Sequence, residues 1–370
     1  MAVPLLDLKA QHATIRDEVL PELVKLIDDQ AFILGAPVGA LECDVAGLSR
    51  TRYAVGCANG TDAILIALRA LDIGRGDEVV TTPFTFFATA GTIHNAGATP
   101  VFVDIDPKTY NIRPDLAAAA VTAKTKAVIP VDLFGQMAAI EEIRRLLPSM
   151  PIIEDAAQSI GARRKIDGKW VMAGQAATIG TFSFFPSKNL GGYGDGGMIV
   201  TQDEAIFKRL QRLRTHGSVQ TYFHEEVGYN SRLDALQALV LSAKLPHLAA
   251  WSAKRRENAA FYTEAFADIA EITPPYIDPA NESIFNQYTI RLARRDALKA
   301  HLSAKGIGHS VYYPLPLHLQ PCFAYLGYTE GSCPEAEKAS KEVVSLPVFP
   351  ELTAAQRDEV VAAVRGFFGK

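Results

Sequence analysis

Short apolar runs alternate with helical patterns along the first half of the chain. Apolar runs predict strands near residues 53–57, 78–82, 99–105, 126–131 and 151–155. Between them, apolar positions at helical spacing predict helices over residues 61–72, 85–97, 113–121 and 138–147. This alternation is typical of a mostly parallel sheet that helices cover on both faces. Two further runs, at residues 178–185 and 198–201, follow each other so closely that they predict antiparallel additions to the same sheet.

The second half of the chain has a different pattern. A mostly helical stretch over residues 233–266 is interrupted by Pro246. Beyond it, strands are predicted near residues 287–292 and 308–312, and helices over residues 294–305 and 353–368. We therefore expect an α/β fold with a large domain over residues 1–245, whose mostly parallel mixed sheet is flanked by helices, and a smaller C-terminal α+β domain over residues 246–370. An N-terminal helix is expected to pack on the small domain.

Composition excludes several classes of protein. The 370 residues are 48% hydrophobic and 21% charged and carry a net charge of −4, which is typical of a soluble globular protein and offers no basic surface for nucleic acid or membrane. Residues 79–103 hold no Asp, Glu, Lys or Arg and are long enough to span a bilayer as a helix. Pro83, Gly91, Gly97 and Pro100 divide this stretch into shorter elements, so we expect a buried α/β unit instead.

The cysteine residues and the first residues of the chain bear on metal binding and on cellular location. The four cysteines lie far apart and form no C-x-x-C pair, so we expect reduced thiols and no metal site. The first residues contain charged side chains and no long apolar stretch, so we expect a cytoplasmic protein without a secretory signal.

One segment carries a candidate for covalent chemistry. Residues 181–200 read TFSFFPSKNLGGYGDGGMIV, in which aromatic residues precede Lys188 and five glycines follow it. Gly192, Gly194 and Gly197 have the spacing of a dinucleotide-binding fingerprint, but that motif needs a helix directly after the glycines, where a strand is predicted here. A phosphate-binding P-loop is also excluded, because its lysine follows the glycines.

Two interpretations of Lys188 stay open on these residues alone. Either the lysine is solvated in an irregular turn between two strands, or it stands in a crowded and partly dry site. In the second case the amine loses basicity and becomes a nucleophile that can form a Schiff base. A Schiff-base lysine usually implies pyridoxal phosphate, which also needs an acid for its pyridinium nitrogen, donors for its phosphate and a flat partner for its ring.

The acid and the ring partner each have a candidate. Asp155 follows an apolar strand, with Gln158 just beyond it, and is either the acid or the N-cap of a helix. Phe86, in the segment PFTFFATA, is either the partner of the ring or an aromatic residue of the core.

The phosphate has a candidate site at a predicted strand-to-helix junction. Asn59, Gly60 and Thr61 lie where the free N–H groups of a helix start favour an anion. Ordinary helix capping by Asn59 or Thr61 explains the same residues. Ser183, on the strand that leads to Lys188, can add a hydroxyl group.

Taken together, these motifs resemble a known family, the nucleotide-sugar aminotransferases often called the DegT family, which have the aspartate aminotransferase fold (fold type I). The resemblance extends over almost the whole chain. It rests on the segments PLLDLKAQ, NGTDA, GDEVVTTPFTF, EDAAQSIGA, FSFFPSKNLGGYGDGG, GYNSRLDALQA and YYPLPLHLQP.

The resemblance implies a role for each matching residue. Lys188 would form the Schiff base with pyridoxal 5'-phosphate and carry protons, and Asp155 would hold the pyridinium. Asn230, in GYNSRLD, would reach the cofactor phosphate of the neighbouring subunit, which implies a homodimer with shared active sites. The other implied contacts are Gln158 with the ring hydroxyl, Phe86 with the ring face, and Gly60, Thr61 and Ser183 with the phosphate.

The implied reaction moves the amino group of L-glutamate, which becomes 2-oxoglutarate, to a keto-sugar linked to a nucleoside diphosphate. The sequences SKNL and GDGG around Lys188 resemble those of members that act on 3-keto sugars, which predicts amination at C3. Candidate substrate contacts are Arg232, whose guanidinium can pair with a carboxylate or a diphosphate, Tyr313, and His318 at the mouth of the cavity.

Three other functions stay open at this point. One is amination of the sugar at C4, and another is an amino-acid aminotransferase of the same fold. The third is a regulator that keeps the cofactor pocket without catalysis, although the sequence shows no helix-turn-helix module and no basic stripe.

Overall fold

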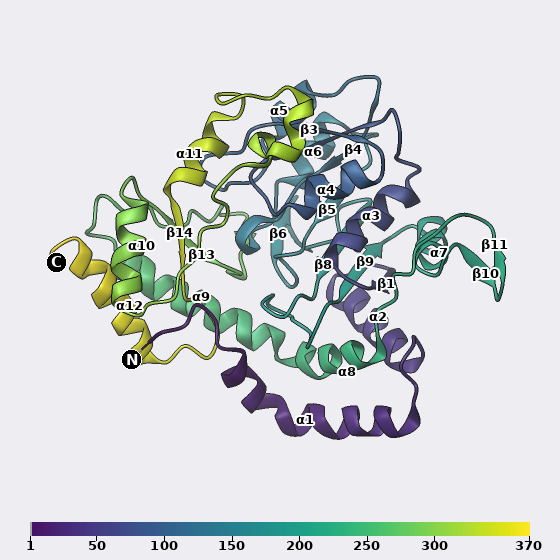
Figure 1. Cartoon of the computed structure of the whole chain (residues 1–370), viewed down its shortest axis with the longest axis horizontal. Coiled ribbons are helices and arrows are strands. Elements are labelled where there is room, and N and C mark those ends of the chain that lie inside the picture. The colour runs from purple at the N-terminus through teal and green to yellow at the C-terminus, as the bar shows by residue number, and fades with distance from the viewer. Residues whose placement is uncertain (1) are drawn as a thin grey trace.

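The computed structural model describes residues 2–370, and a mostly parallel sheet lies at the centre of the larger part (Figure 1). Its strands are β1 (Tyr53–Cys57), β2 (Glu78–Thr81), β3 (Thr99–Phe102), β4 (Thr125–Ile129), β5 (Ile153–Asp155), β8 (Ile179–Ser183) and β9 (Gly197–Thr201). The order is β3-β2-β4-β5-β8-β9-β1, in which two parallel bridges, Val128 to Ile152 and Val131 to Asp155, join β4 to β5. Strand β9 runs antiparallel to β8 and β1, whereas the pairs from β3 to β8 are parallel. The predicted α/β fold class is confirmed.

Helices cover both faces of this sheet. Successive side chains of a strand point to opposite faces, so the buried strands present apolar side chains to a helix layer on each side. Val55 and Ile199 belong to one face, and Ala54 and Val200 to the other. The first face packs against α3 (Gly60–Ala70), α4 (Ala88–Asn95) and α7 (Glu204–Leu213). The second packs against α2 (Ala36–Leu48), α5 (Pro114–Ala119), α6 (Ile140–Leu146) and α8 (Ala235–Lys244).

The N-terminal helix α1 (Leu8–Asp29) lies along α8 at the edge of the molecule (Figure 1). Ile15 and Val19 of α1 pack against Val240 of α8, and Trp251 lies beside them. The segment ahead of α1 reaches the C-terminal part, where Val3 joins the core. The contact with the C-terminal part is thus made by the segment before the helix, and α1 itself packs mainly on α8.

The C-terminal part has its own core around a two-stranded sheet. Strands β13 (Tyr288–Arg291) and β14 (Val343–Leu346) are antiparallel and pack against α9 (Leu248–Ala265), α10 (Arg295–Ala304) and α12 (Ala354–Phe367). The strand expected at residues 308–312 is reduced to a single bridge between Ser310 and Ser345. The turn η2 (Leu245–His247), which contains Pro246, joins α8 to α9.

Smaller elements complete the chain. They are η1 (Leu133–Gly135), β6 (Arg163–Ile166), β7 (Lys169–Met172), β10 (Ser218–Gln220), β11 (Phe223–His224), β12 (Asn281–Glu282), η3 (Leu317–Leu319), η4 (Pro321–Leu326) and α11 (Pro334–Glu342). The hairpin β10-β11 projects from the body of the molecule (Figure 1). Within residues 2–370, no helix combines the length and the apolar character that crossing a membrane requires.

Candidate active site

Lys188 lies in the turn that follows β8. Its backbone N–H donates to Phe185 O at 2.8 Å, and its side chain is half-buried. Burial lowers the pKa of Lys188 to about 8, and the charge of nearby Asp155 opposes this shift. A substantial fraction of the amine is therefore neutral near pH 7 to 8, as a nucleophile or a general base requires.

The glycines after Lys188 are needed for space. Within the described chain, none of the five has a positive φ. A Cβ atom on Gly191 would lie 2.3 Å from Pro186 O, and one on Gly197 would lie 2.4 Å from Asn59 O. Any side chain at these two positions would collide with main-chain atoms, so glycine lets the loop fold back on itself beside the start of α3.

Helix α8 holds this loop through two side chains. Gln237 Oε1 accepts a hydrogen bond from Tyr193 N at 2.7 Å, and Lys244 Nζ donates to Gly191 O at 2.6 Å. Burial also lowers the pKa of Lys244 to about 8, but its ammonium group is engaged by Gly191 and lies 4.8 Å from the centre of the Tyr193 ring. Sequence reasoning missed both residues, because a helical glutamine and a helical lysine carry no local signal of their partners.

Asp155 ends β5 and is 5% exposed. Thr89 Oγ1 donates to Asp155 Oδ2 at 2.7 Å, and Ala157 N donates to Oδ1 at 3.3 Å. Burial raises the pKa of Asp155, while these two donors and the charge of Lys188 oppose the rise. Residues 157–161 form a turn and no helix, so the alternative of a helix N-cap does not apply.

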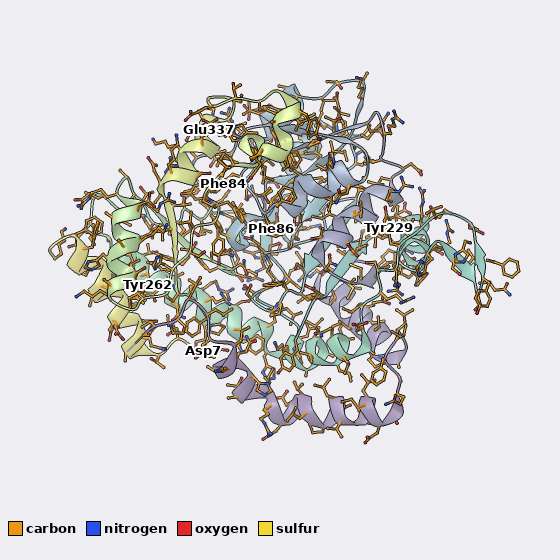
Figure 2. All side chains as sticks on the ribbon, viewed as in Figure 1. Asp7, Phe84, Phe86, Tyr229, Tyr262 and Glu337 are labelled. Atoms are coloured by element: carbon orange, nitrogen blue, oxygen red, sulfur yellow. The ribbon has the colours of Figure 1, made fainter. Side chains whose placement is uncertain are left out.

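Both polar atoms of the Gln158 side-chain amide form hydrogen bonds. Its Oε1 accepts from Phe134 N at 2.7 Å, and its Nε2 donates to the hydroxyl of Tyr313 at 3.1 Å. The Tyr313 ring packs edge-on against Phe84 at 6.2 Å and lies tilted, 6.4 Å from Phe86. Phe86 is 57% exposed and lies near the middle of the molecule in Figure 2, so its ring has a free face.

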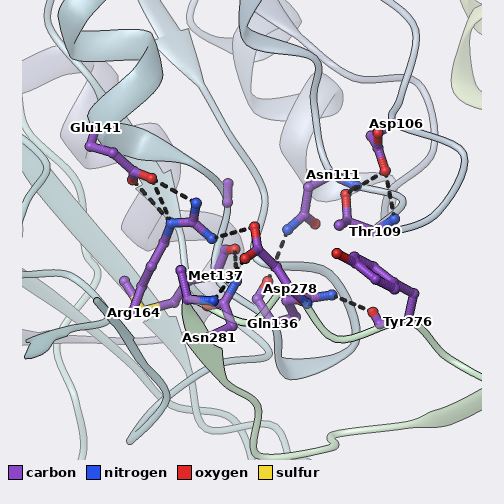
Figure 3. A network of polar contacts seen from close by, with 12 residues as sticks. Asp106, Thr109, Asn111, Gln136, Met137, Glu141, Arg164, Tyr276, Asp278 and Asn281 are labelled. Carbon is purple, nitrogen blue, oxygen red and sulfur yellow. Dashed lines mark hydrogen bonds and ion pairs between the residues drawn. The ribbon is translucent and has the colours of Figure 1, made fainter. Parts of the chain in front are cut away.

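A polar network supports the loop behind Gln158 (Figure 3). Asn111 Nδ2 donates to Gln136 O at 3.0 Å, and Gln136 Oε1 accepts from Asp278 N at 2.7 Å. Asp278 in turn forms an ion pair of 3.0 Å with Arg164, which is 4% exposed. Because the network joins the segment after β3 to β6 and to the segment that leads to β13, it fixes the position of the loop that contacts Gln158.

The start of α3 forms a cradle with the end of β8. A Cβ atom on Gly60 would lie 2.6 Å from Ser183 Cβ, so the two residues are in close contact. Asn59 Oδ1 caps Asp62 N at 2.8 Å. The N–H groups of Gly60 and Thr61 are the ones that a helix start leaves without intrahelical partners. These N–H groups and the positive end of the helix dipole make the start of α3 a favourable position for an anion.

The GYNSRLD segment runs beside this cradle. Ser231 Oγ accepts from Ala58 N at 3.3 Å, and the exposed Asn230 precedes it, bridged to Thr215. Arg232 is half-buried and, among residues 2–370, has no ion-pair partner. Both side chains are thus available to a molecule or chain outside this one.

His318 does not lie at the mouth of a cavity, where it was expected. It is 1% exposed, and its Nε2 lies 3.0 Å from Oε1 of Glu337 on α11. The segment PLPLHLQP enters the core because Leu317 and the neighbouring aromatic residues bury it, so His318 contributes to packing. In the described part of the chain, no group of His, Cys, Asp or Glu residues is arranged to hold a metal ion.

Comparisons with known proteins agree with this geometry. Residues 13–365 match the DegT/DnrJ/EryC1/StrS aminotransferase family. A "pleiotropic regulatory protein" of Geobacillus stearothermophilus is 53% identical over 100% of this chain and 99% of its own. A UDP-N-acetyl-3-dehydro-alpha-D-glucosamine 3-aminotransferase of Acidithiobacillus ferrooxidans is 48% identical over 98% and 97%. The crystal structure of S. venezuelae DesV in complex with a ketimine intermediate superposes with a TM-score of 0.96 at 39% identity, over 100% and 99% of the two chains.

The family match covers most of the chain, and the relatives are similar over their whole lengths. The resemblance inferred from the sequence motifs is thereby confirmed. This chain belongs to the DegT/DnrJ/EryC1/StrS aminotransferase family.

Proposed function

We propose that this protein is a pyridoxal-phosphate-dependent aminotransferase that moves the amino group of L-glutamate to C3 of a keto-sugar linked to a nucleoside diphosphate. The observation that carries the proposal is the pairing of Lys188, whose pKa burial lowers to about 8, with the buried Asp155. The Acidithiobacillus ferrooxidans relative, a 3-aminotransferase of a UDP-linked 3-keto sugar, supports the substrate class and the position.

The described residues fit the cofactor. Asp155 is a buried carboxylate with one oxygen held by Thr89, and the exposed ring of Phe86 can cover a flat molecule. Glycine at position 60 lets the helix start approach Ser183 closely, so the Ser183 hydroxyl and the N–H groups of Gly60 and Thr61 would hold the phosphate together. Gln158 would hold the ring hydroxyl. When bound, the cofactor acts as an electron sink that stabilises negative charge on the carbon that loses its proton.

The chain's own residues supply binding and proton transfer. Lys188 would hold the cofactor covalently, and its free amine would be the base that moves a proton between two carbon atoms. Its lowered pKa suits both directions of this transfer near neutral pH. Asp155 would hold the pyridinium nitrogen of the bound cofactor with a fixed carboxylate, because Thr89 and the backbone of Ala157 orient its two oxygens.

A second copy of the chain completes the site in this proposal. Asn230 is exposed and borders the phosphate cradle through Ser231. The hairpin that precedes it projects from the molecule and exposes large apolar side chains, which is unusual for a free surface. These side chains are Val219, Tyr222, Phe223 and Val227. A homodimer with shared sites explains both features, and Arg232 would then face the substrate diphosphate or a sugar carboxylate.

Mixed dimers test the shared site. Lys188→Ala and Asn230→Ala chains should each have little activity alone, because each homodimer lacks one element of every site. A 1:1 mixture after refolding should recover about a quarter of the wild-type activity, since half of the dimers carry one intact site. A mixture whose activity is only the mean of the two homodimers would show that Asn230 acts within its own chain.

A non-catalytic regulator is the second candidate, because the Geobacillus stearothermophilus relative is named a regulatory protein. An amino-acid aminotransferase and a C4-specific sugar aminotransferase are further alternatives. The regulator is disfavoured by the retention of Lys188, Asp155 and Ser183, which a binding function alone does not need.

Absorption spectra and an acceptor panel distinguish these functions. The purified protein with pyridoxal phosphate should show a visible band that borohydride fixes on Lys188 and that L-glutamate bleaches. The bleached protein should regain the band with a UDP-linked 3-keto sugar and much more slowly with a 4-keto sugar or a keto acid. Absence of any band would favour the regulator, and preference for a keto acid would favour the amino-acid enzyme.

A further inference from the structure

A buried pair of carboxyl groups lies behind the candidate site. Asp132 follows β4, Glu154 precedes Asp155 on β5, and both members of the pair are 0% exposed. Asp132 Oδ1 accepts from Ala138 N at 2.8 Å, and Oδ2 accepts from Ser159 Oγ at 2.7 Å. Because Val131 bridges to Asp155 in parallel and successive side chains of a strand alternate between faces, Asp132 and Glu154 lie on the same face of the sheet, where their carboxyl groups interact.

One oxygen of the buried Glu154 side chain has no hydrogen-bond donor among the described residues. Its Oε2 accepts from Gly174 N at 3.0 Å, whereas its buried Oε1 receives no hydrogen from any donor among residues 2–370. Two touching carboxylates out of contact with water would repel each other strongly, and a carboxylic acid that donates to a carboxylate removes that repulsion. Since Asp132 already accepts two protein donors, Glu154 is the member that carries the proton.

The charges around the pair agree with this assignment. Asp155 is the other ionisable group that faces Asp132, and it adds negative charge, while Lys188 is the cation beside Asp155. No basic side chain pairs with Asp132 or Glu154 among the described residues. Burial raises the pKa of both carboxyl groups, and that of Glu154 rises well above its ordinary value of 4.5.

The pair is linked to the turn that carries the cofactor contacts. Asp132 N donates to Asp155 O at 3.0 Å, and Asp132 Oδ2 holds Ser159, next to Gln158. We propose that Glu154 is a positioning residue, whose protonated carboxyl group donates to Asp132 and so fixes the turn that presents Asp155 and Gln158 to the cofactor. This inference rests on the proposed function for its consequence, but the proton itself can be tested without cofactor.

The first test compares the unfolding of the cofactor-free wild type with that of Glu154→Gln from pH 4 to pH 9. A raised pKa in the folded state means that the folded wild type loses stability as the pH rises above about 4.5. Glutamine keeps the shape and the hydrogen-bond donor but cannot ionise. The urea midpoint of Glu154→Gln should therefore rise relative to that of the wild type with increasing pH. A difference that stays constant from pH 5 to pH 9 would show that Glu154 is already ionised and would overturn the inference.

The second test measures the dissociation constant of pyridoxal phosphate at pH 7 by equilibrium dialysis. Glu154→Gln should bind within about threefold of the wild type, and Glu154→Leu, which gives Asp132 no donor, should bind about tenfold or more weakly. Equal binding by a folded Glu154→Leu variant would overturn the positioning role. If the leucine variant does not fold, the pH comparison decides alone. A wild type that binds no cofactor would instead overturn the proposed function, whatever the unfolding data show.

Discussion

Replacing Lys188 with alanine is expected to abolish transamination, with a fall in kcat on the order of 10⁴-fold or more. The loss is large because, in the proposed function, one side chain supplies both the covalent anchor and the proton carrier. Its amine is suited to both tasks, since burial lowers its pKa to about 8. The measurement is the rate of glutamate-dependent bleaching of the visible band in single turnovers, with the rate of sugar amination as a second readout.

Lys188→Arg is the matched control for this prediction. Arginine keeps a positive charge beside Asp155 but stays protonated and forms no Schiff base, so it should be as inactive as alanine. Both variants should unfold at nearly the same urea concentration as the wild type, because the lysine side chain is only half-buried and, among residues 2–370, makes no hydrogen bond that holds the turn. Turnover by Lys188→Ala at a rate close to that of the wild type would contradict the assignment of the nucleophile.

Much of the large domain could be predicted from the sequence because its signals are local. The strand at residues 53–57 has the predicted bounds, and the helix predicted over 61–72 is observed over Gly60–Ala70. Buried parallel strands are continuous apolar runs, and the helices between them start at capping residues such as Asn59. The C-terminal part was harder to predict. The strand expected at residues 308–312 forms only one bridge, and β14 (Val343–Leu346) was not predicted. There the pairing joins segments distant in the chain, which no local pattern indicates.

The candidate site was predictable where its residues stand next to an element end. Asp155, Ser183 and Gly60 lie at strand ends or a helix start, where parallel strands bring them together. The residues that hold the glycine-rich loop and Asp155 in place were not predictable. Gln237 and Thr89 act through hydrogen bonds between segments far apart in the sequence. His318 shows the converse, since a histidine in a loop-like segment proved to be buried against Glu337.

Asp155→Asn is expected to give the second large loss, a fall of about 10³-fold in the rate of transamination. A carboxylate about 4 Å from a pyridinium contributes roughly 4 kcal/mol at an effective dielectric constant near 20. That energy corresponds to about three pKa units of the ring nitrogen. Asparagine keeps the size and polarity of the side chain, so the loss reports the charge. The measurement is the rate of bleaching by L-glutamate at saturating cofactor, which separates this loss from weaker binding.

Thr89→Val provides the graded comparison that distinguishes charge from position. Thr89 Oγ1 donates to Asp155 Oδ2 at 2.7 Å, so valine removes one orienting hydrogen bond and leaves the carboxylate in place. We expect about a tenfold fall in rate, as for the loss of a hydrogen bond to a charged group. If Thr89→Val and Asp155→Asn were equally impaired, orientation would be the decisive contribution of this carboxylate. If neither variant were impaired, the acid that holds the pyridinium would have to be another residue. The proximity of Lys188 to Asp155 would then no longer support the proposed function.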